Sequence, residues 1–160
     1  QWRVLSVDGD DAFLLADKNL DAKPYNRSRG SVIWKTCTLR SWLNGYGALE
    51  NITCTDYSSD NFIDKAFTNT AQNAIKTTTV VNNPYLGTEG GIDTNDKIYL
   101  LSTEEAMTPD YGFTSSDNNT ATREAKNTAY VKEQGIYNGT RTDYSGNGFY
   151  WLRSPGDGTK

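Results

Sequence analysis

Histidine is absent from this 160-residue chain, which also holds only two cysteines, four prolines and one methionine. Without histidine, the chain can build neither a Ser-His-Asp nor a Cys-His catalytic site, and no zinc or iron site with a histidine ligand. Two cysteines are too few for a four-cysteine metal site. Because no nucleophile motif stands out either, we expect a protein that is not an enzyme and needs no cofactor.

The two cysteines leave two alternatives open. A disulfide between Cys37 and Cys54 would close a short loop and contribute roughly 3 kcal/mol by the loop-entropy relation. Two separate thiols are the other possibility. We favour the disulfide, because the composition is typical of extracellular proteins, in which disulfides persist.

Long apolar runs and runs of positive charge are missing as well. The chain is 36% hydrophobic, its mean hydropathy is −0.70, and its formal net charge at pH 7 is −4. Binding to nucleic acid or to an anionic membrane surface depends on clustered basic side chains. We therefore expect neither a nucleic-acid partner nor insertion into a membrane.

Aromatic residues, in contrast, are abundant, with 4 Trp, 10 Tyr and 5 Phe. Two tryptophan-centred segments, Trp34 to Gly45 and Gly148 to Gly156, each combine aromatic and aliphatic side chains with one arginine, Arg40 or Arg153. Aromatic side chains bury the most apolar surface per residue. Both segments are therefore predicted to anchor the core.

The hydrophobic pattern predicts one α+β domain spanning residues 1–160, with short helices early, a small antiparallel sheet and long loops. We expect a β-hairpin from Trp2 to Ala16, and strands at 77–81, 97–101 and 149–152. Helices are expected at 39–44 after a Thr38 cap, in two halves of 60–76 with a Thr68 cap, after a capping box at 102–105, and at 128–134. Both chain ends look cut from a longer protein, because each lies next to a predicted strand.

The ordered set of motifs resembles a widespread family of domains of unknown function in secreted and surface proteins of bacteria. The resemblance extends over nearly the whole chain. It rests on residues 2–5, 20–26, 34–45, 66–68, 77–80, 96–106, 128–130 and 151–156.

This family is in turn similar to the C-type-lectin-like fold, in the branch shared with formylglycine-generating enzymes and variable ligand-binding proteins. The resemblance implies an extracellular or cell-surface protein with a role in adhesion or carbohydrate binding. Two departures stand out: the chain stops before the closing C-terminal strands of such domains, and Cys37 replaces a small polar residue. The cysteine pair of formylglycine-generating enzymes lies late in the fold, whereas Cys37 and Cys54 lie early, so that activity is not implied.

Residues 143–148 have the oxygen spacing of the first half of a calcium loop, with Asp143, Ser145 and Asn147 as candidate ligands. Ser154 stands where the loop would need a bidentate glutamate, and no flanking helices are predicted. A glycine-rich turn is the favoured alternative.

Three loops, 82–95, 109–119 and 136–147, are rich in residue types suited to adaptable recognition. They supply Tyr85, Tyr111 and Tyr144 as candidate ligand contacts, to which Arg153 and Asp157 are added on a neighbouring loop. For the two arginines we favour a structural role, stacked on an aromatic ring or paired with a buried carboxylate.

The sequence therefore favours a non-catalytic binding or display module that recognises a glycan or a cell-surface protein. A structural subunit or spacer of a surface assembly is the alternative, with self-association through the terminal strands. An enzyme is the least favoured of the three.

Overall fold

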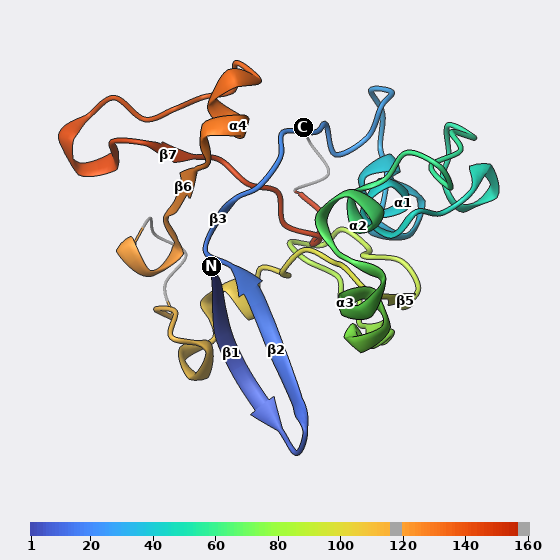
Figure 1. The fold of residues 1–160 in the computed structure, drawn as a ribbon, viewed down its shortest axis with the longest axis horizontal. Coiled ribbons are helices and arrows are strands. Elements are labelled where there is room, and N and C mark those ends of the chain that lie inside the picture. The colour runs from blue at the N-terminus through green and yellow to red at the C-terminus, as the bar shows by residue number, and fades with distance from the viewer. Residues whose placement is uncertain (116–119, 157–160) are drawn as a thin grey trace. The chain divides into compact units, whose positions relative to one another are not determined.

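The computed structural model describes residues 1–115 and 120–156 (Figure 1). The chain divides into two compact units. The hairpin unit comprises Gln1–Lys23 and Thr103–Trp151, and the helical unit comprises Pro24–Ser102 and Leu152–Lys160. The fold is mixed α/β with few helices, as predicted, but the strands form three small sheets where one was expected.

The hairpin unit begins with the predicted β-hairpin, in which β1 (Trp2–Asp8) pairs antiparallel with β2 (Asp11–Ala16) (Figure 1). Gly9 has φ 58° in the two-residue turn, a conformation that glycine adopts without steric cost. A second sheet joins β3 (Lys18–Asn19) parallel to β6 (Ala125–Asn127), which pairs antiparallel with β7 (Asn147–Gly148). The predicted all-antiparallel arrangement is therefore wrong for β3 and β6.

The rest of the hairpin unit consists of loops and short helices. In α4 (Ala129–Glu133), the Thr128 side chain caps the first turn and Gly135, with φ 73°, follows the end, which confirms the helix predicted there. The 3₁₀ helices are η3 (Glu105–Met107), η4 (Pro109–Tyr111), η5 (Ala121–Arg123) and η6 (Thr142–Tyr144). Its buried apolar residues are Leu5, Ala106, Phe113 and Val131.

The helical unit is built around the first tryptophan segment. After η1 (Trp34–Thr36), α1 (Thr38–Asn44) ends at Gly45 with φ 71°, as predicted. The core cluster consists of Trp34, Cys37, Leu39, Trp42 and Leu43, so this segment does anchor a core. Its N-cap is Cys37 and not Thr38, because the Cys37 sulfur accepts the Arg40 amide at 3.4 Å.

The remaining elements of the helical unit lie around α1. They are η2 (Ala48–Glu50), α2 (Phe62–Ala66), α3 (Asn69–Ala74), β4 (Thr78–Val80) and β5 (Thr94–Asp96), with β4 and β5 antiparallel. Thr68 caps α3 through a bond from the Ala71 amide, so the predicted division of 60–76 into two helices is confirmed. Among the described residues, no helix has the length and apolar character needed to cross a membrane.

Two predicted strands are wrong, and one predicted short helix forms as a 3₁₀ helix without its expected cap. Residues 97–101 form no strand, because the Asn44 side chain occupies the backbone groups of Lys97 and Ile98. Residues 149–152 form no strand either, and Phe149, Tyr150 and Trp151 are exposed instead of anchoring a core. The capping box at 102–105 precedes only the 3₁₀ helix η3, which has no side-chain cap.

The predicted disulfide between Cys37 and Cys54 is also wrong, since both residues are free thiols. Cys37 is buried in the core cluster, where its sulfur caps α1, whereas Cys54 is exposed in a turn with φ 50°. Burial raises the pKa of the Cys37 thiol to about 11.

We expect one thiol per native chain to react with a maleimide at pH 8, and two after denaturation. The thiolate is the reactive form, and Cys37 is both buried and held in its protonated form. Mass spectrometry of the labelled protein measures the count, and the Cys54→Ser variant serves as the control with no native labelling. Equal native labelling of both cysteines would contradict this arrangement.

Candidate functional site

A buried polar cluster at Asp96 holds the helical unit together. The Asp96 carboxylate accepts hydrogen bonds from Arg40 Nε at 2.8 Å, Trp34 Nε1 at 3.0 Å, Thr94 Oγ1 at 2.7 Å and Tyr46 OH at 3.1 Å. Burial, followed by the Asp96 charge, raises the pKa of Tyr46 to about 12. With Asp96 0% exposed and its oxygens occupied, the cluster is structural.

The preference for a structural Arg40 is confirmed. Its guanidinium pairs with Asp96, lies 4.7 Å from the centre of the Tyr46 ring, and donates to the Lys35 carbonyl at 3.0 Å. The arginine therefore connects α1 to β5 and to the loop that follows α1.

Arg153 makes structural contacts as well, in line with the role favoured for it, and its selection as a ligand contact stays a prediction. The side chain donates to the Leu100 carbonyl at 2.7 Å and to the Val81 carbonyl at 3.2 Å, and lies 5.8 Å from the Tyr99 ring centre. At 6% exposure, Arg153 attaches the C-terminal segment to the core of the helical unit and offers little surface to a ligand.

Exposed aromatic rings gather in the hairpin unit. Tyr137 and Phe149 stack with their ring centres 4.7 Å apart and their planes at 23°, and they are 54% and 77% exposed. Tyr150 and Trp151, also exposed, follow Phe149 in the chain. We call the stacked pair Tyr137 and Phe149 the aromatic loop surface.

Hydrogen bonds fix the backbone beneath the stacked rings. The buried Asn127 side chain donates to the Tyr137 carbonyl at 3.0 Å, and the Gly139 amide donates to the Asn147 carbonyl at 2.7 Å. Farther along, Tyr150 OH donates to Arg123 O at 2.8 Å and Trp151 Nε1 to Lys23 O at 3.1 Å. These contacts restrain the backbone at Tyr137 and the side chains of Tyr150 and Trp151.

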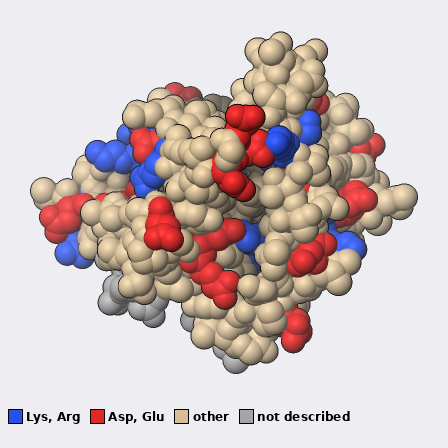
Figure 2. Space-filling model, turned by 90° about the horizontal axis from the view of Figure 1, so that it is seen from below, with Lys and Arg blue, Asp and Glu red and all other residues tan. Residues whose placement is uncertain are grey.

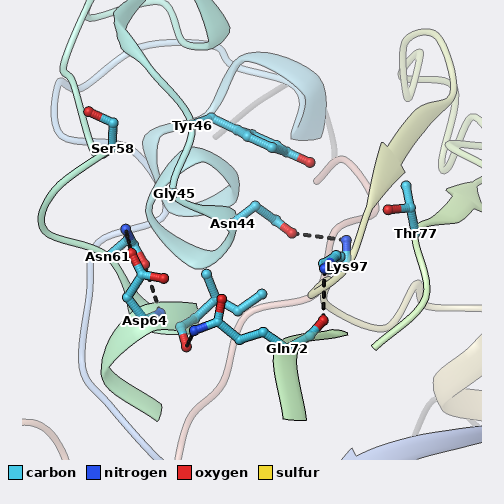
Figure 3. A pocket seen from close by; sticks show the side chains of 10 residues that line it. Asn44, Gly45, Tyr46, Ser58, Asn61, Asp64, Gln72, Thr77 and Lys97 are labelled. Atoms are coloured by element: carbon cyan, nitrogen blue, oxygen red, sulfur yellow. Dashed lines mark hydrogen bonds between the residues drawn. The ribbon is translucent and has the colours of Figure 1, made fainter. Parts of the chain in front are cut away.

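A separate pocket of about 310 Å³ lies in the helical unit (Figure 3). Its lining comes from the end of α1, from the segment entering α2, and from α3 and the loops beside β4 and β5. The lining residues are Asn44, Gly45, Tyr46, Ser58, Asn61, Ile63, Asp64, Gln72, Thr77 and Lys97. Most of their side chains carry hydroxyl or carboxamide groups.

The predicted ligand-contact tyrosines are partly exposed but lie in different units. Tyr85 belongs to the helical unit, in a tight turn that pairs it with Thr88. Tyr111 and Tyr144 belong to the hairpin unit, where Tyr111 packs edge-on against Phe13 and Tyr144 lies 5.7 Å from the Arg141 guanidinium. Asp157 lies outside the described residues.

The predicted calcium ligands lie around η6. Asn147 Nδ2 donates to Glu124 at 2.8 Å, and the Gly146 amide donates to the Gly139 carbonyl at 2.9 Å, so residues 139–147 close as a glycine-rich turn. Of the three candidate ligands, Asp143 alone carries a carboxylate, whereas Ser145 offers a hydroxyl and Asn147 an amide oxygen. Within 1–115 and 120–156, no three acidic or cysteine side chains gather as a metal site would require. Calcium binding stays a prediction.

Sequence reasoning missed Tyr137 and Phe149, although it selected the loop 136–147 that contains Tyr137. A signal was present in the run Phe149-Tyr150-Trp151, because a strand turns alternate side chains outward and cannot bury three consecutive rings on one face. No signal pointed to the pocket, whose lining comes from four separated segments.

On the face drawn in Figure 2, basic side chains lie among acidic ones and form no patch of their own. This distribution fits the net charge of −4. The face drawn in Figure 2 shows no extended basic region of the kind that phosphate backbones need.

The family model described as a domain of unknown function, DUF6273, matches residues 9–160. The chain therefore belongs to the DUF6273 family, in agreement with the resemblance to a family of domains of unknown function. No curated protein and no solved structure matches the chain.

Proposed function

We propose that this member of the DUF6273 family is a non-catalytic binding module of an extracellular or cell-surface bacterial protein, with a C-type-lectin-like fold. The observation that carries the proposal is the stacked, exposed pair Tyr137 and Phe149. Exposing large apolar rings to water is unfavourable in free energy, and a ligand that covers the rings removes this unfavourable contribution.

The ligand class we propose is a glycan, with a cell-surface protein as the other partner that such a surface suits. Flat aromatic rings pack against the apolar faces of sugar rings, while the hydroxyl and amide groups of the neighbouring loops supply hydrogen bonds. Tyr137 provides both, since its ring carries a hydroxyl.

The Phe149→Ala variant is expected to weaken ligand binding by roughly 30-fold, equivalent to about 2 kcal/mol, because an exposed anchor ring of this kind carries a large share of the binding energy. A glycan and surface-protein array identifies the ligand, and isothermal titration calorimetry measures the dissociation constants. The Leu49→Ala variant is the matched control, because Leu49 is 97% exposed and lies in the other unit. Equal affinity of Phe149→Ala and wild type would contradict the proposal.

A structural subunit of a surface assembly is the second candidate, and the hairpin favours it. Both strands of this two-stranded sheet carry exposed apolar side chains, namely Trp2, Val4, Val7 and Leu14. Within the part of the chain that the structure describes, each strand has an edge that no third strand covers. Such an edge can pair with another chain. Sedimentation velocity tests it: concentration-dependent association that the Val4→Lys variant abolishes would favour assembly over ligand binding.

A further inference from the structure

Only two of the pocket-lining residues in the helical unit carry charge, and their signs are opposite. Asp64, an exposed residue of α2, contributes a carboxylate, and the partly buried Lys97, which follows β5, contributes an ammonium group (Figure 3). This balance disfavours a phosphate, which would need several cations, and equally a metal ion, which would need several carboxylates.

Hydrogen bonds to neighbouring groups orient both charged side chains, through a backbone carbonyl for Lys97 and through another side chain for Asp64. Lys97 Nζ donates to the Gln72 carbonyl at 2.8 Å, which uses one of its three N–H groups. Asp64 Oδ2 accepts from the Asn61 side chain at 2.8 Å, and Asn61 is itself buried. Both charged groups therefore keep bonding capacity for a ligand while their orientation is set.

Neutral polar groups make up most of the remaining lining. The Thr77 and Ser58 hydroxyls are exposed, and the Gln72 side chain donates its amide nitrogen to the Ile63 and Phe67 carbonyls at 3.3 and 3.1 Å. The Tyr46 ring lies at one side of the pocket in Figure 3. Its hydroxyl is bonded to Asn95 O and Asp96, so what it offers the pocket is its ring.

We propose that this pocket binds one neutral, polyhydroxylated ring, a hexose or N-acetylhexosamine residue. Each sugar hydroxyl both donates and accepts, so it can donate to Asp64 and accept from Lys97, a pairing that suits a lining with one strong acceptor and one strong donor. The volume of about 310 Å³ is at the lower end of the range for small-ligand sites, which fits a single ring.

This site is separate from the aromatic loop surface, because all its lining residues belong to the helical unit, whereas Tyr137 and Phe149 belong to the hairpin unit. The inference therefore goes beyond the proposed function and does not depend on it.

The test titrates the ¹⁵N-labelled chain with glucose, galactose, mannose and N-acetylglucosamine, and with glycine as a zwitterionic comparison, while amide shifts are recorded by NMR. We expect at least one sugar to shift the amides of Gly45, Asp64 and Thr77 saturably. The Asp64→Asn variant should bind at least five-fold more weakly, although its amide oxygen can still accept from Asn61.

Two further variants sharpen the result. Thr77→Val removes a pocket hydroxyl without changing side-chain size and should also weaken binding, whereas Asp10→Asn, in the hairpin turn, and Phe149→Ala should leave the pocket shifts unchanged. The proposal is overturned by a folded chain whose pocket amides respond to none of the four sugars. Shifts produced by glycine alone, or shifts that Asp64→Asn leaves intact, would overturn it equally.

Discussion

Replacing Asp96 with alanine is expected to lower the free energy of unfolding by about 3–5 kcal/mol, the range for removing one partner of a buried ion pair. The substitution leaves the buried Arg40 guanidinium without its carboxylate partner, and it also removes the acceptor of the Trp34 indole and the Thr94 hydroxyl. An uncompensated buried charge costs more than the pair itself contributes.

Urea unfolding followed by the fluorescence of the buried Trp34 and Trp42 measures the change. Asp10→Ala is the matched control, because Asp10 is exposed in the hairpin turn, where the expected effect is within about 0.5 kcal/mol. Asp96→Asn should lie between the two, since an amide oxygen can still accept some of the bonds. A loss below 1 kcal/mol for Asp96→Ala would show that the cluster does not hold the helical unit together.

The second large effect is expected for Arg153→Met, with a loss of about 2–4 kcal/mol in unfolding free energy. Two backbone carbonyls, Leu100 O and Val81 O, lose a charged donor, and hydrogen bonds of this kind contribute about 1.5–3 kcal/mol each. Methionine also removes the cost of burying the guanidinium charge, which offsets part of the sum of these two contributions. Methionine keeps much of the volume, so the change isolates the guanidinium. The Arg153→Lys variant should recover little of this unfolding free energy, because a single ammonium group lacks the planar fork that reaches both carbonyls.

The same variant separates a structural Arg153 from a ligand contact. Under conditions where Arg153→Met is fully folded, its affinity for the ligand should equal that of the wild type. A variant of unchanged stability that has lost binding would instead support Arg153 as a ligand contact.

The sequence correctly predicted the elements that depend on turn and capping residues lying within a few positions of one another. Gly9 and Gly45 adopt the positive φ that a tight turn and a helix end require, and Thr68 caps α3 as its position suggested. The hairpin, α1 and the division between α2 and α3 followed from these signals.

The elements that were predicted wrongly depend on contacts between residues far apart in the sequence. The backbone of Lys97 and Ile98 bonds to the side chain of Asn44, more than fifty positions away, and no local pattern reveals such a bond. The predicted disulfide was wrong for a similar reason, because the sequence spacing of two cysteines does not show whether their side chains lie close enough to bond. The C-type-lectin-like fold stays a prediction.

For the candidate sites, the sequence predicted the loop that contains Tyr137 but assigned Phe149 to the core. Whether an aromatic ring is buried depends on how much apolar surface the rest of the chain brings to it. In the helical unit, Trp34 and Trp42 lie within one core cluster. Phe149 instead contacts Tyr137 at the surface, and composition alone does not distinguish the two environments.

The most direct test of the central claim is a parallel glycan and surface-protein array of the wild-type chain and the Tyr137→Ala/Phe149→Ala double variant. Thermal unfolding of both proteins, recorded first, confirms that both are folded. We expect a specific set of wild-type signals that the double variant loses. An array on which folded wild type binds nothing, or on which the double variant binds as well as wild type, would contradict a binding module that works through its aromatic loop surface.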